Sequence, residues 1–200
     1  MSFLNTWVGG TDTDFGTAAN WSTEEDEVSI TNRVPVLTDD VLIPNVTNDP
    51  VLDTPRTINS LSITSGGSLD GNNHELTIDG KADGTGATTD EYSVKNDGII
   101  TGTDTDLTLT YAGSTRYDLA GTSGTFRNVT INHSSHAATL YTNLVISGDL
   151  TITAGSLDTR SGSNNAITVA ANCEITGTLI CNASTVATGH GYIRSGCTFT

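Results

Sequence analysis

The sequence predicts an all-β fold, namely a parallel β-helix: a three-sided solenoid of about 22 residues per coil with an aromatic N-terminal cap. Two observations support this prediction. Short clusters of Leu, Ile and Val recur along the chain at a nearly constant step. Thr, Ser, Asn, Asp and 21 glycines fill the intervals between them. Thr and the β-branched residues favour strands, whereas Gly, Asn and Asp favour the corners between strands.

The constant step is clearest in one column of apolar residues. Its members follow one another at intervals of 22, 21, 23 and 22 residues, and a companion column lies two positions earlier. Because alternate side chains of a strand point to the same face, we expect both columns to point inward and to rest on the coil below. The first column is Leu109, Ile131, Ile152, Ile175 and Cys197, and its companion is Leu107, Val129, Leu150 and Cys173.

Two further columns predict the other walls of the solenoid. Ile146, Val169 and Tyr192 are each 23 residues apart, and so are Leu157 and Ile180. A constant step in three separate columns favours a solenoid over a β-sandwich. The sandwich is the alternative fold, because its strands also recur at intervals of about 8–12 residues.

Two longer segments resemble each other, and two others break the pattern. Leu61–Asp70 returns as Leu150–Asp158 with one residue fewer, so we expect these segments to be equivalent parts of different coils. Lys81–Glu91 contains small and polar residues, and we expect a loop that projects from a corner. Tyr111–Thr125 is also irregular and is expected to be a loop.

The first part of the chain differs from the rest in its aromatic content. Trp7, Phe15 and Trp21 lie among glycines and acidic residues. A solenoid needs a covered first coil, because bare strand edges and an apolar cross-section would otherwise face water. Large aromatic side chains suit that task. We therefore predict a capping or attachment module over residues 1–37 and coils over residues 38–200, with docking of the three rings onto a partner protein as the alternative role.

The motifs of this module follow one another in a familiar order. Thr6–Gly10 reads TWVGG, Ala19–Ser22 reads ANWS, Val34-Pro35 follows, and Asp39–Pro44 reads DDVLIP. This order resembles the opening of pectin-lyase-like, right-handed β-helix surface proteins of bacteria and phages, and Leu144–Asp158 is similar to their coil repeats. The resemblance implies right-handed coils and a surface protein. It bears on the fold more than on function, because proteins of many functions share such coil motifs.

The charge of the chain argues against two kinds of partner. It carries 8 Lys and Arg against 23 Asp and Glu, a net charge of −15. Nucleic-acid binding needs clustered cations, so neither nucleic acid nor an anionic membrane is a predicted partner. No stretch predicts a membrane span, and the opening residues lack the pattern of a signal peptide. Cys173, Cys181 and Cys197 have no CxxC spacing and are expected to be small buried side chains in a protein that folds in a reducing cytosol.

Three pairs of acidic residues have the chemistry that glycoside hydrolysis requires, but each pair also fits a turn. Asp70 and Asp158 follow matching leucines of the two similar segments, which favours a turn-forming role. We therefore predict a protein that is not an enzyme, with no catalytic residue, no cofactor and no metal. The three pairs are Asp104 with Asp106, Asp39 with Asp40, and Asp70 with Asp158.

Three other kinds of site have weaker signals. Asp12–Asp14 and Asp104–Asp106 have the D-x-D spacing of calcium loops, but neither continues to the Gly and distal Glu of an EF-hand. His133 and His136 lack an evident third ligand, so a surface turn is favoured over a zinc site. T-x-T phrases such as Thr108–Thr110 occur on ice-binding solenoids, but Thr is also a generic strand residue.

These observations leave three classes of function. We favour a non-enzymatic structural protein of a virion surface: a phage capsid decoration, fibre or spike component. The alternatives are a secreted bacterial adhesin or cell-surface filament protein, and a tailspike that binds or degrades polysaccharide and contacts a host-surface glycan. An adhesin needs an export signal, whereas a virion protein assembles in the host cytoplasm. The predicted location is therefore the virion surface, with the extracellular cell surface as the alternative.

The expected partners follow from this class. They are other capsid or tail proteins and further copies of the same chain, with a trimer suggested by analogy with spikes. The carboxyl end, Cys197–Thr200, falls inside an expected coil. We therefore expect either a longer product or another subunit that covers this end.

Overall fold

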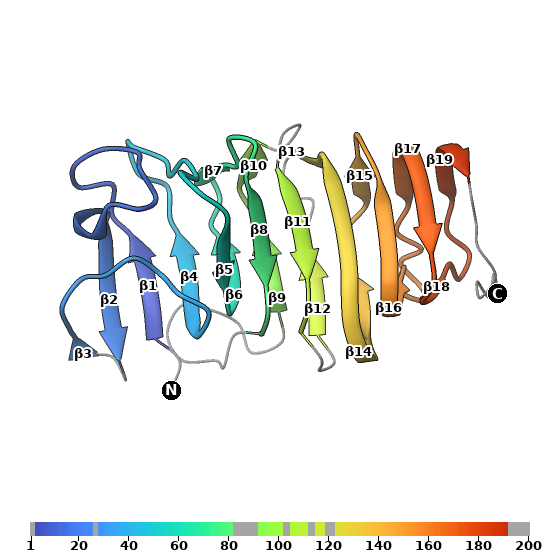
Figure 1. Ribbon diagram of the computed structural model, residues 1–200, viewed down its shortest axis with the longest axis horizontal. Coiled ribbons are helices and arrows are strands. Elements are labelled where there is room, and N and C mark those ends of the chain that lie inside the picture. The colour runs from blue at the N-terminus through green and yellow to red at the C-terminus, as the bar shows by residue number, and fades with distance from the viewer. Residues whose placement is uncertain are drawn as a thin grey trace.

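The computed structural model describes residues 3–25, 28–81, 92–101, 105–111, 115–118 and 123–191 (Figure 1). The prediction of an all-β fold is confirmed. These residues form nineteen strands, and the only helix among them is the short 3-10 helix η1 (Ala18–Asn20). Most strand pairs are parallel, and the strands lie side by side along the longest axis of the molecule (Figure 1). No helix of the described residues is long and apolar enough to cross a membrane.

The parallel strands form three stacks, named A, B and C here, in which each strand pairs with one from an earlier and one from a later part of the chain. Strands β14, β16 and β17 are long enough to belong to two stacks each. Stack A contains β5 (Arg56–Ile58), β8 (Glu75–Ile78), β11 (Asp106–Leu109), the first parts of β14 (Asn128–Leu140) and β16 (Leu150–Asp158), and the last part of β17 (Ile167–Ile175).

Stacks B and C are built in the same way. Stack B contains β1 (Phe3–Trp7), β4 (Asp39–Ile43), β6 (Ser60–Ile63), β9 (Tyr92–Asn96), β12 (Thr115–Asp118), the last parts of β14 and β16, and β18 (Thr178–Ile180). Stack C contains β7 (Ser68–Asp70), β10 (Ile99–Thr101), β13 (Ser123–Phe126), β15 (Leu144–Ile146), the first part of β17, and β19 (Val186–Gly191).

The principal apolar column lies in stack A, as the sequence predicts. Leu109 pairs with Ile131, Ile131 with Ile152, and Ile152 with Ile175, and all four side chains are fully buried. The companion column is in register too, and the fifth expected member, Cys197, lies outside the described residues. The column therefore runs across four successive strands of one wall.

Two other predicted columns are wrong in their later members. Leu157 pairs with the buried Leu179, whereas the half-buried Ile180 pairs with Asp158. The corner that follows Ile175 is one residue shorter than the corner that follows Ile152, and counting at a fixed step cannot detect this.

A similar correction applies in stack C. Ile146 pairs with Val169 as predicted, but Val169 pairs with Thr188. The predicted partner, Tyr192, lies outside the described residues. Thr188 follows Val169 after 19 residues instead of 23, so the interval between these paired strands is shorter than the preceding one.

The two similar segments are not equivalent parts of their coils. Leu61 lies in stack B, where it pairs with Val94, whereas Leu150 lies in stack A. Asp70 likewise pairs with Thr101 in stack C. Each segment is a strand, a corner and a second strand, and this local unit can occupy any two adjacent walls. Its recurrence therefore does not fix which wall it forms.

The two expected loops have different outcomes. Most of Lys81–Glu91 lies outside the described residues. The expectation for Tyr111–Thr125 is wrong in part, because β12 and the first residues of β13 lie there. This segment is rich in Thr, Ser and Gly, so it has little of the apolar alternation by which a strand is recognised.

The N-terminal segment joins the same sheet. Strand β1 pairs in parallel with β4 and antiparallel with β2 (Trp21–Glu25), which in turn pairs antiparallel with β3 (Val28–Ser29). The predicted boundary between residues 37 and 38 thus falls between β3 and β4. One hydrophobic cluster extends from Trp7 to Cys181, so the aromatic segment and the stacks share a core.

The register generates a paired prediction. Replacing Ile152 by Ala should lower the free energy of unfolding by about 2–5 kcal/mol, because it leaves a cavity between Ile131 and Ile175. Replacing its neighbour Thr151, which points to the other face, by Val should change it by less than about 0.5 kcal/mol. Urea unfolding followed by circular dichroism measures both. Equal losses in the two variants would contradict the assigned register.

Candidate functional site

The three aromatic residues singled out in the sequence form one buried cluster. The Trp7 and Trp21 ring centroids are 4.9 Å apart at an interplanar angle of 77°, and those of Phe15 and Trp21 are 4.7 Å apart at 67°. The three side chains are at most 1% exposed. Both indole groups also donate hydrogen bonds, from Trp7 Nε1 to the Asn48 carbonyl and from Trp21 Nε1 to the Phe15 carbonyl.

This packing bears on the two roles considered for the cluster. Edge-to-face rings with satisfied N–H groups are typical of a core, and such pairs stabilise by about 0.5–1.5 kcal/mol beyond the burial of their area. Enclosed rings offer no surface to a partner protein in this conformation. The arrangement is therefore what a cap requires, and contact with a partner would have to use other residues of the segment.

The D-x-D motif beside the cluster is a folded turn. Asp14 N–H donates to Asp12 Oδ1, and Gly16 N–H donates to Asp14 Oδ1. The buried Asn20 closes the turn by donating from Nδ2 to Asp12 Oδ1, while its Oδ1 accepts from Thr11. These carboxylates therefore act as acceptors for the local backbone and for one amide, in the manner of an Asx turn.

The other acidic candidates are also engaged within the protein. The buried Asp39 accepts from the Arg33 guanidinium and from the Val36 N–H. Its neighbour Asp40 accepts from the side chains of Asn59 and Ser60. Asp104 lies outside the described residues, so its predicted pair with Asp106 has no geometry here.

The histidines and the other described residues that could act as metal ligands form no site either. His133 is buried within β14, contrary to the expected surface turn, and the side chain of His136 lies outside the described part of the structure. Among the described residues, no group of three or more His, Cys, Asp or Glu side chains could hold a metal ion.

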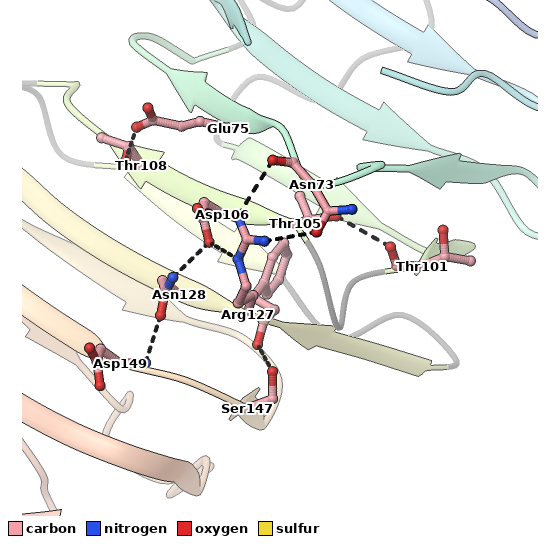
Figure 2. A network of polar contacts seen from close by, with 11 residues as sticks. Asn73, Glu75, Thr101, Thr105, Asp106, Thr108, Arg127, Asn128, Ser147 and Asp149 are labelled. Atoms are coloured by element: carbon pink, nitrogen blue, oxygen red, sulfur yellow. Dashed lines mark hydrogen bonds and ion pairs between the residues drawn. The ribbon is translucent and has the colours of Figure 1, made fainter. Parts of the chain in front are cut away.

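A polar network surrounds Arg127, which directly follows β13 (Figure 2). The guanidinium donates from Nε and Nη2 to the two oxygens of Asp106, at 2.8 and 2.6 Å. Nη1 donates to Asn73 Oδ1 at 3.0 Å. One arginine thus connects two parts of stack A: strand β11, through Asp106, and the turn before β8, through Asn73.

Amide side chains continue this network along the stack. Asn128 Nδ2 donates to Asp106 Oδ1 at 2.8 Å, and Asn128 Oδ1 accepts from the backbone N–H of Asp149 at 2.9 Å (Figure 2). Asn172 Nδ2 then donates to Asp149 Oδ1 at 3.0 Å. We call Asp106, Asn128, Asp149 and Asn172 the corner ladder, because each residue immediately precedes a member of the companion column.

The network lowers the pKa of Asp106. The hydrogen bond from Arg127 is the main cause, burial opposes it, and Asn128 adds to the lowering. Burial is the largest single influence on Asp53 and raises its pKa, but the hydrogen bond and charge of Arg56 and the local backbone hydrogen bonds together outweigh burial, so the pKa is lowered. An acid held in its ionised form by an arginine is poorly suited to donate a proton near neutral pH. Asp106 instead accepts hydrogen bonds from Arg127 and Asn128.

Outward threonines form a second regular feature of stack A. Thr77, Thr108, Thr130 and Thr151 are in register on successive strands, more regularly than the T-x-T phrases in the sequence indicate. Glu174 takes the next position on β17. An ice-binding face would need an uninterrupted array of neutral side chains. Glu174 interrupts the array at its end, and Glu75 interrupts it where it accepts a hydrogen bond from Thr108.

Comparison with known proteins adds no assignment: no family model, no curated protein and no solved structure matches this chain. The similarity of the opening motifs to pectin-lyase-like surface proteins thus stays a prediction from the residues. The corner ladder was not predicted, although its signal is present in the sequence. Every member stands one residue before an apolar column that the sequence identifies.

The lowered pKa of Asp106 predicts a pH dependence. Its ionised form is favoured by folding, so it contributes stability above the ordinary pKa of 3.8, and that contribution is lost as the pH falls through the lower pKa of the folded state. Arg127→Gln should raise the pKa of Asp106 in a carboxyl NMR titration. It should also reduce the loss of stability between neutral pH and pH below that value. Arg56→Gln, at the separate pair with Asp53, is the control and should leave the Asp106 titration unchanged.

The aromatic cluster predicts the fluorescence of the native protein. The chain has two tryptophans, and both lie in the cluster, so emission should be blue-shifted and protected from acrylamide until the protein unfolds. Trp21→Ala should lower the free energy of unfolding by about 3–5 kcal/mol, measured by circular dichroism. Val8→Ala, at a nearby exposed position, should have a small effect. Red-shifted native emission with ready quenching would contradict the buried cluster.

Proposed function

We propose that this chain is a right-handed, three-sided parallel β-solenoid that serves as a non-enzymatic structural protein of a virion surface. The observation that carries the proposal is the stacking of inward apolar side chains in register across stacks A, B and C. Such a wall is stiff along its axis, because each strand within it is hydrogen-bonded on both sides. The repeating residues of stack A are Leu109, Ile131, Ile152 and Ile175.

The use of the polar residues supports a structural role. Asp39, Asp53 and Asp106 each pair with an arginine, Asp149 accepts from Asn172 of β17, and Asp158 accepts from Asn182 in the turn after β18. Carboxylates in these contacts connect neighbouring strands and corners. The excess of 23 acidic over 8 basic residues gives the chain a net charge of −15, which keeps particles that display it apart in solution.

Two further features favour a virion among surface assemblies. Cys173 occupies a core position in register with Leu150, so it fills a position that an aliphatic residue takes on the neighbouring strand, and Cys181 is buried as well. That use suits a protein that folds in a reducing cytosol. The opening motifs, TWVGG and ANWS, resemble those of phage and bacterial surface proteins. Other capsid or tail proteins and further copies of the chain are the proposed partners.

Analysis of particles purified from the source tests this proposal. Mass spectrometry of density-gradient fractions should find the chain at a constant ratio to the major capsid protein, and electron microscopy should place it on the outside. An acidic host protein of similar size is the control and should be lost during purification. Recovery of the chain from the host cell wall, with none in the particle fractions, would support the adhesin instead.

A further inference from the structure

One corner of the molecule departs from the pattern of internal pairing. It is formed by Tyr141 and Asn143 after β14, by Arg160 and Asn164 after β16, and by Tyr92 of β9. The Tyr92 and Tyr141 ring centroids are 5.5 Å apart, and the Arg160 guanidinium lies 3.8 Å from the centroid of Tyr141. We call these five residues the Tyr–Arg corner.

Arg160 differs from the other arginines whose side chains the structure describes. Arg33, Arg56 and Arg127 each contact an Asp carboxylate. Within the described part of the chain, the Arg160 guanidinium contacts no carboxylate and lies on a tyrosine ring instead. In a chain with 23 acidic residues and 8 basic ones, such a guanidinium is available to an external anion.

The backbone of Arg160 is in the left-handed region, with φ of 65°. This conformation costs a residue with a Cβ about 1–2 kcal/mol, and the positions that share it on the other corners are Asn or Gly. Glycine would adopt it without that cost. An arginine held there despite the strain points to a use for its side chain, since strained residues cluster at binding sites.

The polar groups around the guanidinium suit a hydroxylated ligand. Asn143 Oδ1 accepts from Ala166 N–H and Asn164 Oδ1 accepts from Ala183 N–H, so both amide NH₂ groups are left as donors at exposed positions. The turn is open beside them, because a Cβ built on Gly162 would meet no atom within 4 Å. Tyr92 and Tyr141 are half-buried, so part of each ring is exposed at the same corner.

We propose that the Tyr–Arg corner binds a saccharide that bears a carboxylate. The guanidinium would take the carboxylate through two parallel N–H···O bonds, which is the geometry that Arg provides and Lys does not. The tyrosines would contact the apolar face of the sugar ring, and the amides of Asn143 and Asn164 would donate to its hydroxyls. This binding site goes beyond the proposed structural role and does not depend on it.

The charge of the protein restricts the class of saccharide that can bind. Asp158 lies two residues before Arg160 and accepts its backbone N–H, and the whole chain is strongly acidic. A densely charged polyanion would be repelled by this surface. The ligand is therefore a saccharide with a single carboxylate, or with carboxylates separated by neutral sugars.

Binding can be tested by NMR on the isotope-labelled full chain. The probes are a glucuronic-acid-containing disaccharide, the neutral disaccharide cellobiose, and acetate. The acidic disaccharide should shift the amides of residues 159–164 and the side-chain signals of Asn143 with saturation, whereas cellobiose and acetate should bind at least about tenfold more weakly. If acetate binds as tightly as the acidic disaccharide, the site recognises only a carboxylate, and the proposal of a saccharide ligand is overturned. Absence of any shift with the acidic disaccharide would overturn the site.

Variants of Arg160 separate binding from folding. Arg160→Gly relieves the left-handed strain, so its thermal midpoint should be at or above that of the wild type while its affinity falls at least about tenfold. Arg160→Lys keeps the charge but should also bind more weakly. Asn72→Gly, at a left-handed position on a distant corner, is the control and should bind like the wild type. Unchanged affinity in Arg160→Gly would contradict the proposal.

Discussion

The structure depends on one constraint: each buried side chain of a strand must pack against the side chain in register with it on the neighbouring parallel strand. Parallel strands are about 4.8 Å apart, so an Ile above an Ile fills the space between walls without a gap. The column from Leu109 to Ile175 meets this constraint on four successive strands. Corners can lengthen or shorten, and loops can be inserted, provided that the next strand returns in register.

The same geometry determines where the polar residues lie. The residue before a column member on one strand lies beside the residue before the corresponding column member on the neighbouring strand. Like charges at that separation repel each other. The corner ladder avoids the repulsion by alternating Asp106, Asn128, Asp149 and Asn172, so that each carboxylate meets an amide. At the end of the ladder, Arg127 neutralises Asp106 and reaches the coil below. A chain with a net charge of −15 can in this way hold acidic residues in register along one edge.

Sequence periodicity predicted the wall and its inward residues because the step between coils is nearly constant there. It failed where a corner changed length: the corner after Ile175 is a residue shorter, and Leu179 therefore took the place expected for Ile180. The similar segments starting at Leu61 and Leu150 misled for another reason, since a local strand–corner–strand pattern carries no information about which wall it occupies. The burial of Trp7 and Trp21 agrees with the predicted cap, but the residue types alone did not distinguish a cap from a docking surface, because both require large aromatic side chains.

Residues that break the internal pattern are informative because the rest of the chain follows it so closely. A sequence under selection for folding alone would place Gly or Asn at a left-handed corner and would set an arginine against one of its many carboxylates. Asn72, Asn164 and Asn182 satisfy the first condition, and Arg33 and Arg127 satisfy the second. Arg160 satisfies neither. A wall of stacked parallel strands is well suited to hold such a residue, because the strain at one corner is small compared with the stability of the columns on either side. The side chain is thereby held in a fixed position at the surface, where a ligand can contact it.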